Sequence, residues 1–329
     1  MEKGCVLVTG GAGYIGSHVA LELLDHGWRV VILDNLTTGD RRLVPAGANF
    51  VNGDAGDFEL VTGLLRRHNC GAVLHFAGST VVPESVGDPL AYYRNNTVVS
   101  RTLIAACVAA GVFRFIFSST AAVYGDPDRL PVREVDPTRP LSPYGNSKLC
   151  TEMVLRDVDA ATPLRYVALR YFNVAGADPE GRSGQSTPQA THLVKVACEV
   201  ATGRREAITI HGVDYDTPDG TCVRDFVHVS DLATAHVAAL RHLMAGGGSR
   251  TLNCGYGHGF SVREIVETTR RLSGRPMVVH IGPRRPGDIV AMVADTARIR
   301  RELAWTPRFV GDMDAIVGSA LAWEKNTHT

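Results

Sequence analysis

A glycine-rich turn near the amino terminus places the strongest constraint on how this chain can fold. Gly10, Gly13 and Gly16 form a GxxGxxG pattern between a short apolar run, 5–9, and a segment of helical length, 14–26. Glycines at a strand-to-helix turn permit a tight bend, close backbone approach to a pyrophosphate and close helix packing. The N–H groups that begin the helix then face the phosphates. The pattern favours a dinucleotide-binding unit, although an ordinary turn would also use glycine.

The rest of the first half alternates apolar, β-branched runs with longer helical patterns. We expect these repeated βα units to form a parallel, doubly wound sheet with right-handed crossovers. The expected strands are 5–9, 29–33, 72–76, 113–118 and 166–171, and the expected helices are 14–26, 57–68, 89–110 and one that begins near Ser142.

The pattern changes after about residue 173, where 176–188 and 214–220 have the Gly, Pro, Ser and Thr content of loops. The predicted fold class is α/β, a Rossmann-type doubly wound parallel sheet with a smaller mixed α/β C-terminal substrate lobe. The expected domains are 1–175 and 176–329, and some elements of the second can return to the main sheet. The shorter elements expected there are 194–202, 223–229, 231–244, 262–272 and 298–303.

The charge balance and the cysteine and histidine patterns exclude several classes of site. Lys and Arg together number 34, as do Asp and Glu, so no global basic field predicts a nucleic-acid partner. The seven cysteines are scattered and contain no CxxC pair, which argues against a disulfide framework or a zinc site. The 12 histidines form neither HxH nor HExxH, so we expect no metal.

The sequence carries no recognisable targeting signal. The chain passes from Met1 almost directly into the first expected strand, without the charged and apolar leader of an export signal. No apolar run approaches the roughly 20 residues that span a bilayer. We therefore expect a cytoplasmic protein with no membrane partner.

An acidic residue at the end of the second expected strand indicates which dinucleotide would bind. Asp34 lies about 20 residues after the glycine-rich turn, where a carboxylate accepts hydrogen bonds from an adenosine ribose and repels a 2′-phosphate. This favours NAD over NADP. Two alternatives remain. Arg41 and Arg42 follow closely and could bind the 2′-phosphate of NADP, and Asp34, which precedes Asn35, could simply form a turn.

A hydroxyl cluster and a YxxxK pair are the candidate catalytic residues. Ser118 and Thr120 lie at the carboxyl end of an expected strand, and Tyr144 and Lys148 follow in the next helical stretch. The i,i+4 spacing puts the phenol and the ammonium on one helix face, where the cation can favour the ionised phenol. A YxxxK pair also arises by chance, with a packed Tyr and a solvated Lys. Its place after a phosphate loop and a strand-end hydroxyl cluster favours the catalytic interpretation.

Taken together, these motifs resemble the extended short-chain dehydrogenase/reductase family over nearly the whole chain. The likeness rests on 10–18 (GGAGYIGSH), 34–36 (DNL), 75–78 (HFAG), 92–96 (YYRNN), 143–148 (PYGNSK), 169–173 (LRYFN), 219–225 (DGTCVRD) and 283–288 (PRRPGD). The last two of these segments make the match most specific.

The resemblance implies a bound NAD and an enzyme that inverts C4 of a UDP-hexose, interconverting UDP-galactose and UDP-glucose. Hydride would pass transiently from C4 to NAD and return to the opposite face of a 4-keto intermediate. It implies Tyr144, Lys148 and Thr120 as catalytic residues. The implied cofactor contacts are Gly10, Gly13, Tyr14, Ile15, Gly16, Asp34, Asn35, Asp54, Ala55, Phe76, Ala77, Gly78, Asn96, Ser118, Tyr144, Lys148 and Tyr171.

The resemblance also implies a set of residues for the UDP-sugar and a homodimer. A pyrophosphate in a chain without net charge needs local guanidinium donors, which agrees with the arginines of this set; the alternative for each is a solvated loop charge. The dimer would form through the helices 89–110 and 142–157. The implied substrate contacts are Thr120, Tyr144, Phe172, Asn173, Arg224, Arg285 and Asp288.

Three positions depart from the family's best-known epimerase pattern. A Lys expected near Thr80 is absent, which puts one cofactor phosphate contact in doubt. Thr120 replaces a common Ser but keeps the hydroxyl. Met292 lies where a residue bordering the sugar pocket is expected, and its flexible side chain leaves acceptance of N-acetyl sugars open.

Three other functions share part of this motif pattern. A 4,6-dehydratase needs an acidic pair beside the catalytic hydroxyl, whereas Ala121 and Ala122 follow Thr120 here. Epimerases of UDP-pentoses, UDP-uronic acids or UDP-N-acetylhexosamines share the machinery and are stronger alternatives. A non-catalytic dinucleotide-binding regulator would not need an intact Tyr144 and Lys148 pair.

Overall fold

The computed structural model describes residues 4–187, 190–285 and 287–327. Pro286 of the 283–288 motif lies outside the described residues. The same holds for residues 1–3 of the first expected domain and 328–329 of the second.

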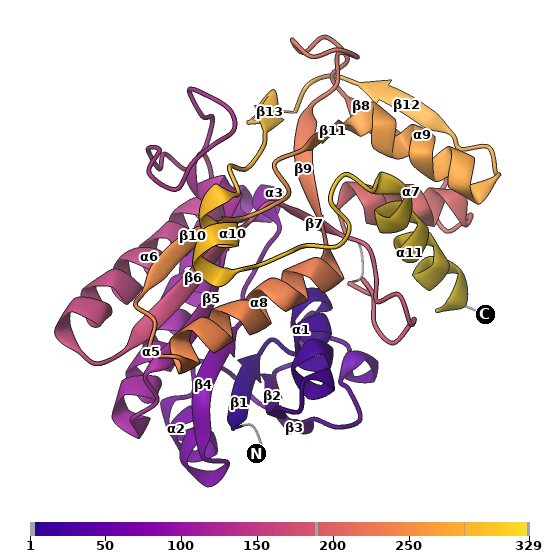
Figure 1. The fold of residues 1–329 in the computed structure, drawn as a ribbon. Helices are drawn as coiled ribbons and strands as arrows, with labels where there is room; N and C mark the ends of the chain where they lie inside the picture. The colour runs from indigo at the N-terminus through magenta and orange to yellow at the C-terminus, as the bar shows by residue number, and fades with distance from the viewer. Residues whose placement is uncertain (1–3, 188–189, 286, 328–329) are drawn as a thin grey trace.

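Seven parallel strands form the main sheet, in the order β10-β6-β5-β4-β1-β2-β3 (Figure 1). The order runs outward from β1 in both directions, which confirms the predicted doubly wound α/β architecture. The strands are β1 (Cys5–Thr9), β2 (Arg29–Asp34), β3 (Asn49–Asn52), β4 (Cys70–His75), β5 (Arg114–Thr120), β6 (Arg165–Tyr171) and β10 (Arg250–Cys254).

Helices cover both faces of this sheet because alternate residues of each strand point to opposite sides. Val6 and Val8 pack on Val19 of one covering helix, whereas Leu7, between them, packs with Leu64 on the other side. One face carries α1 (Tyr14–Asp25) and α8 (Val229–Met244), and the other carries α2 (Phe58–Arg67), α5 (Val99–Ala110) and α6 (Pro143–Ala161).

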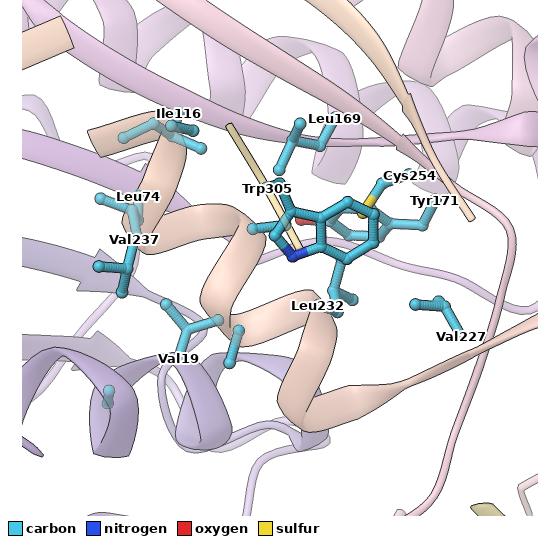
Figure 2. Packing of buried hydrophobic residues seen from close by; sticks show 14 of the residues in the cluster. Val19, Leu74, Ile116, Leu169, Tyr171, Val227, Leu232, Val237, Cys254 and Trp305 are labelled. Atoms are coloured by element: carbon cyan, nitrogen blue, oxygen red, sulfur yellow. The ribbon is translucent and has the colours of Figure 1, made fainter. Parts of the chain in front are cut away.

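The larger core lies between the sheet and α8. Figure 2 shows Leu74, Ile116 and Leu169, from three neighbouring strands, beside Leu232 and Val237 of that helix. These residues are fully buried. An element from the second half of the chain therefore completes the hydrophobic core of the first half.

Two small sheets and three helices form the remaining part. β9 (Val223–His228) pairs with β7 (Asn173–Ala175), β11 (Gly259–Ser261) and β13 (Ala291–Met292). β8 (Ile208–His211) pairs with β12 (Val279–Gly282). The helices α7 (Leu193–Ala201), α9 (Val262–Ser273) and α11 (Met313–Asn326) pack on one another, on the right of Figure 1.

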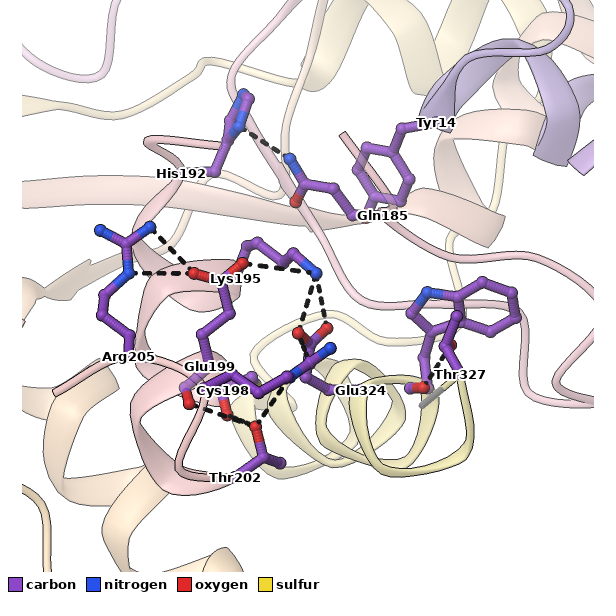
Figure 3. A network of polar contacts seen from close by, with 12 residues as sticks. Tyr14, Gln185, His192, Lys195, Cys198, Glu199, Thr202, Arg205, Glu324 and Thr327 are labelled. Atoms are coloured by element: carbon purple, nitrogen blue, oxygen red, sulfur yellow. Dashed lines mark hydrogen bonds and ion pairs between the residues drawn. The ribbon is translucent and has the colours of Figure 1, made fainter. Parts of the chain in front are cut away.

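A group of charged side chains, which we call the helix-joining network, connects α7 to α11 (Figure 3). Lys195 Nζ lies 2.7 Å and 2.9 Å from the two carboxylate oxygens of Glu324, and both side chains are buried. Arg204 also pairs with Glu324, and Arg205 pairs with Glu199 at 2.9 Å. Glu324 of α11 therefore has cationic partners on α7 and on the turn that follows it, and loss of that carboxylate would leave the buried Lys195 without this partner.

Most predicted elements are present within two residues of their expected bounds, with one exception. The expected helix 89–110 is three elements, α4 (Pro89–Tyr92), a π-helical turn (Tyr93–Val98) and α5. Such turns are frequent at functional sites. The other short elements are α3 (Val82–Gly87), α10 (Ala297–Leu303) and 3₁₀ turns at Arg41–Leu43 and Ala121–Val123.

Two strands of the main sheet and the last helix were not predicted. β3 and β10 have only four and five residues, with polar residues at their ends, and both lie at the edges of the sheet. α11 was missed although Asp312, its N-cap residue, is a typical helix start. Within the described ranges, no helix has the length and apolar character needed to cross a membrane.

Candidate active site

The candidate residues lie along one edge of the main sheet, where the carboxyl ends of its strands meet. Gly10 follows β1, Asp34 ends β2, Thr120 ends β5 and Tyr171 ends β6. The strand order reverses between β1 and β4, which is where open α/β sheets bind their ligands. Parallel pairing therefore gathers residues that are far apart in the sequence.

The glycine-rich turn needs glycine for steric reasons. Gly10 has φ +70°, and a Cβ there would lie 2.5 Å from the backbone nitrogen of Ala77. A Cβ on Gly16 would lie 2.2 Å from the carbonyl oxygen of Gly10. Gly13 is the N-cap of α1 and provides no side-chain cap for the first backbone N–H groups. The turn thus fits an anionic group such as a dinucleotide pyrophosphate.

Asp34 is 8% exposed and supports the glycine-rich turn directly. Its Oδ2 accepts a hydrogen bond from Ala12 N at 2.9 Å, and its Oδ1 accepts one from Leu36 N at 2.8 Å. A carboxylate has about four lone-pair positions, so capacity remains for ribose hydroxyls. Arg42 forms a bidentate pair with Asp40, and Arg41 lies 4.2 Å over the Phe50 ring. The partners of both arginines favour NAD over NADP.

Three further residues predicted to contact the cofactor follow the ends of β2 and β3. Asn35 is exposed, and its Oδ1 accepts from the backbone and the hydroxyl of Thr37. Asp54 is also exposed and accepts from Gly56 N at 2.6 Å. Ala55, beside it, is buried.

Asn96, in the π-helical turn, holds together two segments that border the site. Its Oδ1 accepts from Ser79 N at 2.8 Å, and its Nδ2 donates to Ser79 O and to Ser147 Oγ, both at 3.0 Å. Ser79 follows Phe76, Ala77 and Gly78, the residues predicted to contact the cofactor. Asn96 is only 1% exposed, and both its Oδ1 and its Nδ2 take part in these contacts.

The candidate catalytic residues converge at the junction of β5 and α6. Ser142 caps α6 by accepting a hydrogen bond from Gly145 N, and Pro143 occupies the first turn, as is typical of helix starts. Tyr144 therefore lies at the positive end of the helix dipole, which favours a phenolate. Thr120 Oγ1 accepts from Ala122 N at 3.1 Å, which leaves its hydroxyl proton free to be donated.

The ionisation of these groups differs from the simple expectation that Lys148 stabilises the Tyr144 phenolate. Burial raises the pKa of Tyr144, and the hydrogen bond from the Thr120 side chain opposes this rise. Burial lowers the pKa of Lys148 to about 8. The ammonium donates to the carbonyl oxygen of Ser118 at 3.0 Å and lies 5.1 Å from the centre of the Phe117 ring. Thr120 is therefore the partner that lowers the Tyr144 pKa here.

Three of the residues predicted to hold a UDP-sugar lie in or next to the small sheet of β7, β9, β11 and β13. Asn173 begins β7, next to β9, and Arg224 of β9 is paired in register with Met292. Arg224 donates to Val223 O at 2.9 Å. Phe172 packs in a cluster with Met292, so both side chains are buried.

Arg285 and Asp288 form an ion pair with each other in the loop between β12 and β13. Arg285 Nε lies 2.8 Å from the Asp288 carboxylate, and the guanidinium remains 56% exposed. Sequence reasoning placed both residues on the substrate but did not predict this pairing. The described residues contain no group of three or more His, Cys, Asp or Glu side chains suited to a metal ion.

Comparison with known proteins agrees with this geometry. The family model described as "NAD dependent epimerase/dehydratase family" matches residues 6–255. The chain belongs to this family. A protein of Azospirillum brasilense named UDP-glucose 4-epimerase is 58% identical over 98% of this chain and 92% of its own length. The resemblance to the extended short-chain dehydrogenase/reductases is thereby confirmed.

Solved structures of epimerases have the same fold over nearly the whole chain. The crystal structure of UDP-glucose 4-epimerase from Brucella ovis in complex with NAD is 44% identical with a TM-score of 0.94, covering 97% of this chain and 98% of that one. The UDP-Glc/GlcNAc 4-epimerase of Campylobacter jejuni is 45% identical with a TM-score of 0.86, covering 98% and 99%.

In this family member, the structure reveals a set of residues behind the catalytic edge that sequence reasoning missed. We call it the catalytic-edge network. Glu152 of α6 accepts from Ser119 and forms a bidentate pair with Arg170 of β6, at 3.0 Å and 2.6 Å. Arg170 also donates to the Tyr124 hydroxyl at 2.8 Å, and that hydroxyl donates to Asn253 Oδ1 at 2.6 Å.

The spacing of Glu152 was a signal that could have identified this network. It follows Lys148 by four residues and Tyr144 by eight, so all three lie on one face of α6. Ser119 lies between Ser118 and Thr120, which contact the other two. This face of the helix is therefore attached to β5 at three consecutive residues.

Proposed function

We propose that this protein is a UDP-glucose 4-epimerase that interconverts UDP-galactose and UDP-glucose with NAD. The observation that carries the proposal is the convergence of Thr120, Tyr144 and Lys148 at the carboxyl edge of the sheet that also carries the glycine-rich turn, in a chain of the NAD-dependent epimerase/dehydratase family. The 58% identity to a relative of that name supports the same activity.

NAD would lie along the carboxyl edge of the main sheet. The uncapped start of α1 and the glycine-rich turn would take its pyrophosphate, and Asp34 would take the adenosine ribose. When bound, NAD supplies the acceptor and donor of hydride for C4 of the sugar. The residues that we assign to its binding, besides the catalytic ones, are Gly10, Gly13, Tyr14, Ile15, Gly16, Asp34, Asn35, Asp54, Ala55, Phe76, Ala77, Gly78, Asn96, Ser118 and Tyr171.

Tyr144 would exchange a proton with the C4 hydroxyl. It accepts the proton as C4 loses hydride, and a 4-keto sugar results; after the sugar turns, hydride and proton return to the other face. Thr120 donates to the phenol oxygen and favours its ionised form. Lys148, held on Ser118 O, keeps a cation beside the same strand end.

The UDP part would keep the keto sugar in place while it turns. We assign this role to Phe172, Asn173, Arg224, Arg285 and Asp288. Arg285 would exchange its pairing with Asp288 for a phosphate oxygen, because a guanidinium binds phosphate bidentately. We infer that residues 1–175 bind the dinucleotide and 176–329 the UDP-sugar, with α8 and β10 serving the first part.

A second candidate substrate class is supported by the surroundings of Met292. This flexible side chain packs on Phe172 rather than presenting a rigid aromatic ring. The Campylobacter jejuni relative is named for both UDP-Glc and UDP-GlcNAc. UDP-N-acetylgalactosamine is therefore the first alternative substrate to test.

We infer that the protein is a homodimer and that it resides in the cytoplasm. Large apolar side chains are exposed on α3, α4, the π-helical turn and α6: Val86 is 66% exposed, Leu90 80%, Val98 56% and Met153 46%. Patches of this kind mark protein interfaces. The seven free cysteines agree with a reducing compartment. Light scattering of the purified protein would test the dimer.

The activity is tested by incubating purified protein with UDP-galactose, without added dinucleotide, and detecting UDP-glucose by chromatography. Tyr144→Phe should lower the rate by about 10²–10⁴-fold, because it removes the proton acceptor. Tyr166→Phe is the matched control, because Tyr166 lies at the start of β6, at the opposite end of that strand from the candidate site. Absence of conversion would lead to added NAD, then UDP-N-acetylgalactosamine, UDP-pentoses and UDP-uronic acids. Failure of every substrate would contradict the proposal and favour a non-catalytic regulator.

A further inference from the structure

His236, on α8, is a buried histidine that contacts the catalytic edge from the second half of the chain. Its side chain is fully buried, and its Nε2 forms a short hydrogen bond with the Tyr171 hydroxyl. The ring also packs 4.9 Å from the centre of the Phe76 ring. Phe76 follows β4 and Tyr171 ends β6, with β5 between these two strands, and both residues are assigned to the cofactor above.

The hydrogen bonds of His236 determine where its proton lies. Nδ1 is 2.8 Å from Leu232 O, one turn earlier in α8. A carbonyl oxygen only accepts, so Nδ1 carries the proton. Burial lowers the pKa of His236 to about 4, so the ring is neutral near pH 7 and has a single N–H. Nε2 is therefore an acceptor, and Tyr171 must donate to it.

This arrangement also orients Tyr171. Its hydroxyl proton points to His236, so the oxygen lone pairs are left for groups at the sheet edge. Tyr171 is paired in register with Thr120 on β5, so its ring belongs to the end of the sheet where the catalytic residues meet. Burial raises the pKa of Tyr171 well above its usual value, opposed by a hydrogen bond from the Ser118 side chain. Tyr171 thus remains a neutral phenol with a defined direction.

We propose that His236 is a positioning residue for the dinucleotide: it accepts a hydrogen bond from the Tyr171 hydroxyl and so presents the phenol oxygen, beside Phe76, as a fixed acceptor for the amide end of the cofactor. This inference rests on the proposed function. The histidine does not touch the reacting atoms; it acts through Tyr171. It gives α8 a part in cofactor retention in addition to its part in the core.

The experiment measures the rate at which NAD leaves the purified holoprotein, by trapping released NAD with an excess of alcohol dehydrogenase and ethanol. His236→Asn keeps an N–H near Leu232 O but removes the acceptor for Tyr171. His236→Gln places an acceptor near the position of Nε2. We expect release to be roughly two- to tenfold faster in His236→Asn, as for a lost hydrogen bond, and closer to wild type in His236→Gln.

Tyr171→Phe provides the second arm of the test. It should speed NAD release to a similar extent, and the double variant with His236→Asn should add little, because both changes remove one shared interaction. His228→Asn is the matched control: this second buried histidine is the N-cap residue of α8 and bonds to Ser319 Oγ of α11 at 3.1 Å, not to Tyr171. It should lower thermal stability without this coupling to Tyr171.

The outcomes separate the inference from the proposed function. Equal NAD release in His236→Asn and wild type, or fully additive effects of His236→Asn and Tyr171→Phe, would overturn the positioning role while the epimerase activity stands. A wild-type protein that neither retains nor binds NAD would overturn both. Equal acceleration by Asn and Gln, matched by His228→Asn, would make His236 a core residue only.

Discussion

The catalytic-edge network and the helix-joining network are both built on buried carboxylates, yet they connect different kinds of elements. In the first, one carboxylate, Glu152, meets one guanidinium, Arg170, and neutral groups satisfy the remaining hydrogen bonds. In the second, Lys195, Arg204 and Arg205 surround two carboxylates, and the side chain of Arg205 is 39% exposed. The first attaches α6 to two strands of the main sheet, and the second attaches α7 to α11.

The difference indicates that similar buried ion pairs can have different roles. One positions the helix that carries the candidate catalytic residues, and the other only joins two helices. A buried pair contributes little net stability, because desolvation offsets attraction, but losing one partner is costly. Changes in either network should therefore destabilise the protein. Only changes in the catalytic-edge network should also slow the reaction of molecules that remain folded.

Acidification should produce the largest effect and should act on both regions. Burial lowers the pKa of His75 to about 3 and of His236 to about 4 near the catalytic edge. It lowers the pKa of His18 in α1 to about 4 and that of His228, which bonds to Ser319 of α11, to about 3. Between these values and about 6.5 the unfolded chain binds more protons than the folded one, so stability falls as pH falls through this window. We expect a loss of about 1.4 kcal/mol per histidine for each pH unit.

Urea unfolding at pH 7, 6 and 5 would measure this slope. His228→Gln should flatten it by the contribution of one proton, because one buried group no longer titrates. A stability that stays constant from pH 7 to pH 5 would contradict the neutral state assigned to these four histidines.

Removing the central carboxylate of each network is the sharpest test of the comparison. Glu152→Ala and Glu324→Ala should each lower the free energy of unfolding by about 3–5 kcal/mol, because each leaves buried cations without their partner. At a temperature where both variants are folded, kcat should fall in Glu152→Ala and stay near wild type in Glu324→Ala. Equal kcat values in the two variants would remove the distinction between position and cohesion.

Removing one hydroxyl group at each network should show the same contrast in kcat, with a smaller loss of stability. Ser119→Ala keeps the Glu152–Arg170 pair but loses the bond from β5 to α6, at a cost of about 1 kcal/mol. Thr202→Ala, which loses the hydroxyl contacts with Cys198 O, Glu199 O and Arg204 Nε, is the control in the other region. We expect kcat to fall several-fold only in Ser119→Ala; a normal kcat would show that Glu152 does not set the helix position through Ser119.

The smallest effect should come from the exposed rim of the helix-joining network. Arg205→Ala removes the pair with Glu199 but leaves Lys195 and Glu324 bonded to each other. Because Arg205 is partly solvated, the unfolding free energy should change by about 1 kcal/mol or less. A loss as large as that in Glu324→Ala, measured in the same urea experiment, would mean that the network acts as one unit.

Several features of the site were accessible from local sequence patterns. The glycine-rich turn, Asp34 at the end of β2 and the i,i+4 pair of Tyr144 and Lys148 each follow from spacing along one strand, turn or helix. Glu152 had the same kind of signal and was overlooked. The ion pair of Arg285 with Asp288 was not anticipated, although both residues were singled out.

His236 had no comparable signal, since its partner Tyr171 is 65 residues away on a different element. The ionisation of the catalytic pair was also beyond the sequence. The i,i+4 spacing predicts Lys148 near Tyr144, but it could not show that the ammonium donates to Ser118 O or that burial raises the Tyr144 pKa. Burial and distant partners decide such quantities, and neither is a property of a short segment.

By itself the sequence determined the α/β class, the doubly wound sheet and the types of residue that carry the chemistry, because hydrophobic period, glycine geometry and helix spacing are local. Only the tertiary structure decided that β10 and α8 complete the first half, that Asn96 serves two protein segments, and that Tyr171 donates to His236. The physical reason is that a hydrogen bond or a pKa depends on which groups packing brings together and removes from water. Spacing along the chain does not specify those neighbours.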